Sequence, residues 1–193
     1  MVINGRLRAF IAIPLSDEAH EGLKSVQDLI MKTGVVAGFP RISSVHITLK
    51  FLGEISQDQL PMIKRKLEDK ISDFESFTLR IKGLGAFPSL TRPRVAWAGI
   101  EAAGHLFRLQ KDIEDAMQEI GFEPEKRSFN PHITLARIKS PRNTDFLESM
   151  LKEMEDFDIG VSPVEAVRIY QSILKPDGAV YKVLEEINSG SRK

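Results

Sequence analysis

The 193-residue sequence contains no cysteine, and this absence excludes disulfide bonds, thiolate metal sites and a cysteine nucleophile. An excess of charge is also missing, because Lys and Arg together number 27 and Asp and Glu together number 27. This balance excludes a strongly basic protein that grips long duplexes through many phosphates, but it leaves room for a local basic cleft. Any catalysis must therefore use residues other than cysteine.

Long apolar runs are absent as well. No run approaches the roughly 18 to 20 residues of a membrane-spanning helix, and Met1 to Arg6 lacks the apolar stretch of a signal peptide. At 193 residues the chain is long enough for one compact domain, and its 42% hydrophobic residues can supply a sizeable core. We therefore expect a monomeric, cytoplasmic protein with no membrane segment.

One tetrapeptide occurs twice, because His46-Ile47-Thr48-Leu49 returns 86 residues later as His132-Ile133-Thr134-Leu135. Each copy alternates polar and apolar residues, a pattern typical of a strand with one buried face. Side chains two apart on a strand lie on the same face at roughly 6.5 to 7 Å. The histidine and the threonine of each copy are therefore expected to project together, while the isoleucine and the leucine point into a core.

Two His-Thr pairs of this kind favour phosphoryl chemistry. A single histidine on a strand is more often structural, but two identical copies indicate duplicated units that bring both pairs to one cleft. Two imidazoles can act as general base and general acid near neutral pH, and two hydroxyls can donate hydrogen bonds to an anion. A metal site is disfavoured, because the sequence has no HxH, HD or HExxH cluster and threonine is a poor ligand.

The flanks of both copies carry a family resemblance. A strand-like run, Arg8 to Pro14, precedes the first motif, Phe51-Leu52-Gly53-Glu54 follows it, and the second motif lies within Phe129 to Arg137. With these flanks and this spacing, the sequence resembles the two-histidine (2H) phosphoesterase superfamily. Within it, the sequence is similar to the RNA 2′,3′-cyclic phosphodiesterase family, historically called 2′-5′ RNA ligase. The resemblance covers nearly the whole chain.

The resemblance implies an enzyme that hydrolyses the 2′,3′-cyclic phosphate of RNA ends or nucleotides to a 2′-phosphate, with no cofactor or metal. It implies that His46 is the proton donor to the leaving oxygen and His132 the proton acceptor from water, although the identical motifs alone assign these roles to neither copy. Thr48 and Thr134 would bind the non-bridging phosphate oxygens. The substrate-binding residues that the resemblance implies are Arg137, Arg127 and Phe51.

Two other functions stay open at this point. A ligase that joins 2′-5′ RNA ends would use the same groups in the reverse direction. A noncatalytic nucleotide or RNA binding module would keep the fold, but binding needs cations more than a paired acid and base, and both pairs are intact. Between residues 123 and 142, around the second motif, five basic residues face two acidic ones, as a bound phosphate requires.

The order of elements predicts a duplicated α+β fold. We expect a single domain, residues 1–193, with two pseudo-symmetric lobes, each an antiparallel sheet backed by helices, and an active-site groove between the sheets. The first motif would lie in residues 1–87 and the second in residues 88–163, followed by a hairpin at 164–187 with a turn at Lys175-Pro176-Asp177-Gly178. Helices are expected after Ser16, after Ser56, over 103–120 and from 143 or 144 to about 154, with His20 and His105 exposed on the first and the third.

Overall fold

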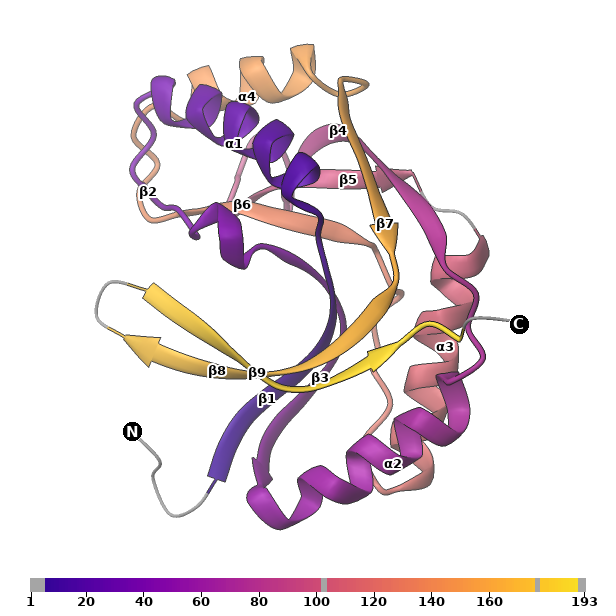
Figure 1. Ribbon diagram of the computed structural model, residues 1–193. Helices are drawn as coiled ribbons and strands as arrows, with labels where there is room; N and C mark the ends of the chain where they lie inside the picture. The colour runs from indigo at the N-terminus through magenta and orange to yellow at the C-terminus, as the bar shows by residue number, and fades with distance from the viewer. Residues whose placement is uncertain (1–5, 102–103, 176–177, 191–193) are drawn as a thin grey trace.

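The computed structural model describes residues 6–101, 104–175 and 178–190, and these residues form two antiparallel β-sheets and four α-helices (Figure 1). Sheet A has the strand order β3-β1-β8-β9, and sheet B has the order β2-β6-β5-β4-β7. The expected α+β class, with antiparallel sheets backed by helices, is confirmed. The strands of sheet A are β1 (Arg6–Pro14), β3 (His46–Ser56), β8 (Ala166–Lys175) and β9 (Gly178–Asn188), and those of sheet B are β2 (Ala37–Gly38), β4 (Phe77–Phe87), β5 (Val95–Glu101), β6 (His132–Ile138) and β7 (Asp158–Val164).

Helices cover the outer side of each sheet. The helix α1 (Asp17–Lys32) packs against β6 and β7 of sheet B, and α4 (Thr144–Glu153) packs against β4 of the same sheet. The helices α2 (Leu60–Ile71) and α3 (Gly104–Glu119) pack against each other and against β9 and β3 of sheet A. The faces that the helices leave uncovered look toward each other (Figure 1). We call these the inner faces of the two sheets.

Each lobe is built from separate stretches of the chain. The helix α1 follows β1 of sheet A in the sequence but packs on sheet B, and α3 follows β5 of sheet B but packs on sheet A. The strand β4, which ends at Phe87, pairs with β5, so sheet B does not begin at residue 88, where we expected the second lobe to begin. The strands β8 and β9 pair as a hairpin, and Pro176 and Asp177 of its turn lie outside the described residues. The organisation of the chain as one domain stays a prediction.

One continuous hydrophobic core joins the two lobes. It includes Ile47 and Leu49 of β3 together with Ile133 and Leu135 of β6, and each of these side chains is at most 4% exposed. Their burial confirms the alternation that the sequence predicted. Because the burial of each such side chain is worth about 1.5 to 3 kcal/mol, both motif strands are fixed to a common interior.

Capping side chains precede both α1 and α2. Ser16 accepts a hydrogen bond from the backbone N–H of Ala19 at 3.2 Å. Ser56 and Gln59 form a reciprocal capping box at a 3-10 turn (Gln57–Gln59) that leads into α2. Ser16 thus caps the helix that the sequence placed after it, whereas Ser56 caps the 3-10 turn and Gln59, the residue before α2, makes no side-chain capping bond. No helix in the described ranges is both long enough and apolar enough to cross a bilayer.

Two strands of sheet B were not predicted. The strand β2 lies in a stretch that contains Gly38 and Pro40, and its two residues pair with Arg137 and Ile138 of β6. Two residues are too few to show an alternating pattern. The strand β7 contains Gly160 and Pro163, which weaken a strand pattern, but it lies at the edge of sheet B, where proline is tolerated.

The two histidines outside the motifs lie in different surroundings. His105 is exposed on α3 as expected, with its ring centroid 5.7 Å from that of Phe77. His20 was expected to be exposed on α1, but its side chain is only 17% exposed and its Nε2 is buried without a hydrogen-bond partner among the described residues. That expectation was wrong, because α1 packs against β7, a strand that the sequence did not predict, so more of the helix is covered.

Candidate active site

The strands β3 and β6 place both His-Thr pairs on the inner faces. His46 and Thr48 are half-buried and alternate with buried neighbours, and the same holds for His132 and Thr134. The two strands contact each other although they belong to different sheets. The positive charge that His132 carries when it is protonated is also close enough to lower the pKa of His46. The structure therefore brings together the two pairs that the sequence singled out.

A bulge in β3 changes which residues share the inner face. The register of β3 on β1 shifts between Thr48 and Lys50, so Leu49 is an extra residue. Leu49 and Lys50 are consequently both buried, with exposures of 4% and 5%. Phe51 returns to the inner face, where it is 65% exposed and its ring centroid lies 6.2 Å from that of Phe10.

The same bulge recurs in β6. The register of β6 on β5 shifts between Thr134 and Ala136, so Leu135 is an extra residue, and both Leu135 and Ala136 are completely buried. Arg137 thereby returns to the inner face, and its positive charge lowers the pKa of His46. Strict alternation would have placed Arg137 on the outer side. The bulge explains how an arginine three positions after a threonine comes to share its face.

Each motif histidine is held by a backbone carbonyl two residues earlier. His46 Nδ1 lies 2.9 Å from the carbonyl oxygen of Ser44, which ends a 3-10 turn (Ile42–Ser44), and His132 Nδ1 lies 2.8 Å from that of Asn130. A carbonyl only accepts hydrogen bonds, so Nδ1 carries the proton in each neutral ring and Nε2 carries the lone pair. Both rings can therefore exchange a proton through Nε2.

Aromatic rings surround His46. Its ring is stacked on that of Phe10 with centroids 4.7 Å apart, and the rings of Tyr181 and Tyr170 lie 5.0 and 5.8 Å away. The sequence reasoning did not select these three aromatic residues. A signal was present in β1, where residues 9–13 are all apolar and give the strand two apolar faces, although helices cover only one of them.

The surroundings of His46 favour its neutral form. Burial lowers the pKa of His46, and the hydrogen bond to the Ser44 carbonyl opposes this effect because it stabilises the imidazolium. The positive charges of Arg137 and His132 lower the pKa further. A nearby anion would act in the opposite direction, since a negative charge stabilises the protonated ring.

A cavity of about 520 Å³ borders His132 on sheet B. Phe87 and Trp97 line it, and the ring of Phe87 meets the ring of His132 edge-on with centroids 5.0 Å apart. Asn130 also lines this cavity, and a neighbouring cavity of about 460 Å³ shares Trp97. A ligand held at His132 thus has room to extend along sheet B.

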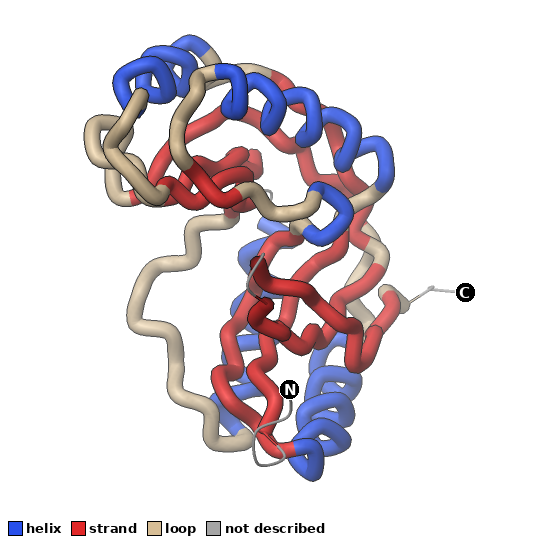
Figure 2. Tube along the Cα trace, turned by 90° about the vertical axis from the view of Figure 1, so that its left-hand side faces the viewer, coloured by secondary structure: helices blue, strands red, loops and turns tan. Residues whose placement is uncertain are grey.

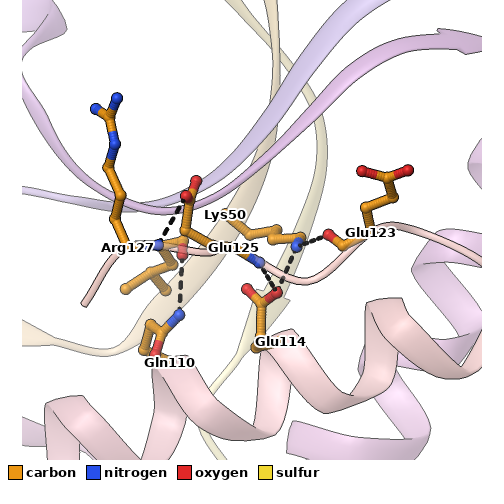
Figure 3. A network of polar contacts seen from close by, with 7 residues as sticks. Lys50, Gln110, Glu114, Glu123, Glu125 and Arg127 are labelled. Carbon is orange, nitrogen blue, oxygen red and sulfur yellow. Dashed lines mark hydrogen bonds and ion pairs between the residues drawn. The ribbon is translucent and has the colours of Figure 1, made fainter. Parts of the chain in front are cut away.

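Arg127 lies on the segment that connects α3 to β6. Its backbone N–H donates a hydrogen bond to a carboxylate oxygen of Glu125 at 3.1 Å, and its side chain is exposed. In Figure 3 the guanidinium points away from the polar cluster that Lys50, Glu114 and Glu123 form. Arg127 is therefore accessible to an anionic ligand, but it lies on a connecting segment rather than on either motif strand.

The fold and the repeated motif match a known family. The model of the 2′-5′ RNA ligase superfamily matches residues 17–172, which run from the start of α1 into β8 and include both motifs and both bulges. The chain belongs to the 2′-5′ RNA ligase superfamily. The family resemblance that the two motifs indicated is thereby confirmed.

Relatives within the 2′-5′ RNA ligase superfamily cover nearly the whole chain. The RNA 2′,3′-cyclic phosphodiesterase of Aeropyrum pernix is 41% identical over 170 residues, which are 88% of this chain and 96% of that protein. The protein of the same name from Methanothermobacter thermautotrophicus is 31% identical over 180 residues, or 93% of this chain and 97% of that protein. The crystal structure of TT0787 of Thermus thermophilus is similar with a TM-score of 0.81 and 28% identity, covering 97% of this chain and 100% of that one.

Proposed function

We propose that the protein hydrolyses the 2′,3′-cyclic phosphate at the end of RNA, or of a nucleotide, to a 2′-phosphate. The observation that carries this proposal is the arrangement of two His-Thr pairs on facing sheets, with Nδ1 of each histidine bonded to a backbone carbonyl and Nε2 left for proton transfer. The names of the relatives with 41% and 31% identity support the same substrate class.

The two histidines take opposite roles in this reaction. A water molecule attacks phosphorus, and His132 Nε2 accepts the proton that the water loses. The bond between phosphorus and the ribose 3′ oxygen breaks, and His46 Nε2 donates a proton to that oxygen. The products are a free 3′ hydroxyl and a 2′-phosphate, and proton exchange with solvent restores both rings.

The remaining inner-face residues bind the phosphate and the nucleoside. The hydroxyls of Thr48 and Thr134 donate hydrogen bonds to the non-bridging oxygens, where negative charge grows in the transition state. Arg137 adds a positive charge on the same face. Phe51 offers an exposed ring on which the terminal base can stack, and Arg127 reaches a neighbouring phosphate.

Substrate binding sets the protonation state of His46. Because the pKa of His46 is lowered by burial and by Arg137 and His132, the free protein favours the neutral ring. The cyclic phosphate carries a negative charge that stabilises the imidazolium. His46 therefore gains its proton together with the substrate, which couples the proton donor to the presence of the phosphate that it serves.

One assay tests the proposed function. A short oligoribonucleotide that ends in a 2′,3′-cyclic phosphate is incubated with the protein in the presence of EDTA, and the phosphate isomer is identified by chromatography. The expected product is the 2′-phosphate, formed at the same rate with and without the chelator. A loss of activity that a divalent ion restores would favour a metal-dependent phosphoesterase, and absence of turnover under all conditions would favour a binding module.

The reverse reaction remains part of the same test, because a ligase would use the same acid and base in the opposite direction. Addition of a second RNA with a free 5′ hydroxyl allows a 2′-5′ joined product to form. We expect hydrolysis to dominate, since water is in large excess. The monomeric state and the cytoplasmic location expected from the sequence stay predictions.

A further inference from the structure

A lysine lies in the core directly beside the first motif. Lys50 follows the extra residue of the β3 bulge, pairs with the buried Ile11 of β1, and has a side chain that is only 4% exposed. The equivalent position of the second motif, 86 residues later, holds the buried Ala136. A buried ion pair is often no more stabilising than apolar side chains of similar volume. Stability alone is therefore a weak reason for a lysine at this position.

The ammonium of Lys50 joins three parts of the molecule. Its Nζ lies 2.5 Å from Glu114 Oε1 on α3 and 2.6 Å from the backbone carbonyl oxygen of Glu123 (Figure 3). The same Glu114 oxygen accepts a hydrogen bond from the backbone N–H of Glu125 at 2.8 Å. The ion pair of Lys50 and Glu114 thus connects the first motif strand to α3 and to the chain that follows α3. We call residues 121–131 the connecting segment.

The connecting segment leads from this cluster to the second motif. It leaves the end of α3, and Figure 2 shows a long loop that passes from one lobe to the other beside the gap between them. Along this segment, a carboxylate oxygen of Glu125 accepts a hydrogen bond from the backbone N–H of Arg127 at 3.1 Å. The ring of Phe129 packs edge-on against that of Phe107 on α3, with centroids 5.8 Å apart. Near its end, the backbone carbonyl of Asn130 accepts a hydrogen bond from Nδ1 of the second motif histidine at 2.8 Å.

We propose that Lys50 and Glu114 are positioning residues for substrate binding. Together they fix the first part of the connecting segment, and through Glu125 they fix the place of Arg127, which the proposed function assigns to a neighbouring phosphate. Because Lys50 also stands two positions after Thr48, the pair links the placement of Arg127 to the first motif strand. This proposal rests on the proposed function for its kinetic consequences, but its structural consequence can be measured without any substrate.

A matched pair of double variants separates this role from simple stability. K50M/E114L removes both buried charges and both contacts to the connecting segment, and apolar replacement of a whole buried pair usually preserves the fold. K111M/D115L removes an ion pair of 2.7 Å on the same helix that is exposed and does not contact the segment. Hydrogen exchange at the amides of Glu125 and Arg127 should become about tenfold faster in K50M/E114L and stay unchanged in K111M/D115L.

The kinetic readout uses the oligoribonucleotide with a terminal cyclic phosphate. K50M/E114L should raise KM about tenfold and lower kcat much less, because Asn130 and the Phe107–Phe129 contact still hold the end of the segment. R127A should raise KM in the same way. The combined variant K50M/E114L/R127A should raise KM no more than R127A alone, since the effects of groups that act through one another are not additive. Additive effects would show that the pair does not act through Arg127.

The remaining outcomes also decide the proposal. A folded K50M/E114L protein with wild-type exchange and wild-type KM would overturn it. If that variant does not fold, E125A on the exposed segment removes the carboxylate that accepts the Arg127 amide without touching the core, and an unchanged KM in E125A would overturn the proposal equally. If wild-type protein hydrolyses no cyclic phosphate, the proposed function fails, while amide exchange still decides whether Lys50 and Glu114 hold the segment.

Discussion

His46 and His132 occupy equivalent positions on β3 and β6, but their surroundings differ. The ring of His46 is stacked on Phe10 at 4.7 Å with two tyrosines close by, whereas His132 meets Phe87 edge-on and borders a cavity of about 520 Å³. Burial therefore lowers the pKa of His46 first, and the charges of the second motif lower it further. Burial among residues outside the tetrapeptide thus shifts the pKa of the first motif histidine.

The bulges extend the comparison beyond the tetrapeptides. Both motif strands return a side chain to the inner face at the third position after the threonine, and this side chain is Phe51 in β3 and Arg137 in β6. One position earlier, the buried residue is Lys50 in β3 and Ala136 in β6. The same backbone device therefore presents a ring on one sheet and a positive charge on the other, which suits a ligand with a base and a phosphate.

The largest expected effect comes from removing either histidine. H46A and H132A should each lower the hydrolysis rate by about 10² to 10⁴, because general acid or base catalysis contributes that much. Both variants should keep the wild-type circular dichroism spectrum, and H105A, at an exposed position on α3, serves as the control with wild-type rate. A wild-type rate in H46A or H132A would contradict the paired acid-base mechanism.

How far the sequence predicts this site can be judged from particular residues. Alternation in each HITL copy predicted that Ile47 and Ile133 are buried and that the histidines and threonines share faces, since a strand fixes side-chain direction by its period of two. The position of Arg137 did not follow from that period, because the bulge depends on pairing with a strand far away in the sequence. Tyr181 is likewise brought beside His46 by the pairing of β8 with β1, because local pattern predicted the hairpin of β8 and β9 but not the strand on which the hairpin docks.

The second prediction separates the two residues that the bulges present. R137A should lower kcat/KM by roughly 10- to 150-fold, because a hydrogen bond or ion pair to a charged group is worth about 1.5 to 3 kcal/mol. F51A should raise KM and leave kcat unchanged, because it removes a stacking surface for the base. Ribose 2′,3′-cyclic phosphate, which has no base, serves as the control substrate.

On this base-free substrate R137A should remain impaired, whereas F51A should match wild type. An equal rise in KM for F51A on both substrates would show that Phe51 acts on the phosphate end or on the fold rather than on the base. The comparison of the two bulges would then lose its division between base and phosphate.

The third prediction concerns the pH dependence of the rate. One neutral and one protonated imidazole are needed, so the profile should be a bell governed by two macroscopic pKa values. In kcat/KM both values belong to the histidine pair of the free protein, and the lower one, which sets the acid limb, should lie on the acidic side of the ordinary histidine value of 6.5 because the pKa of His46 is lowered. In kcat this limb should lie at higher pH, because the bound phosphate favours the imidazolium.

Arg137 provides the matched variant for this profile. Its charge lowers the pKa of His46, so R137A should move the acid limb of kcat/KM to higher pH. An unchanged profile in R137A would mean that the titration of His46 governs neither limb. A rate that stays flat between about pH 5 and 9 would remove both histidines from proton transfer.

The smallest expected effect is on stability and again distinguishes the two motifs. Well above pH 6.5, His46 is neutral in both the folded and the unfolded chain. As the pH falls below 6.5, the unfolded chain takes up the proton first, because the pKa of His46 is lowered in the folded protein. The free energy of unfolding should therefore decrease with falling pH until the folded-state pKa is reached, and remain level with respect to this group below it.

The variant H46F tests this assignment, because phenylalanine can occupy the space between Phe10 and the two tyrosines without titrating. Urea unfolding midpoints of wild type and H46F are compared from pH 8 down to about pH 4, a range in which other groups titrate alike in both proteins. The midpoint of wild type should decrease more steeply than that of H46F below pH 6.5. Parallel curves would mean that burial among the aromatic rings does not disfavour protonated His46.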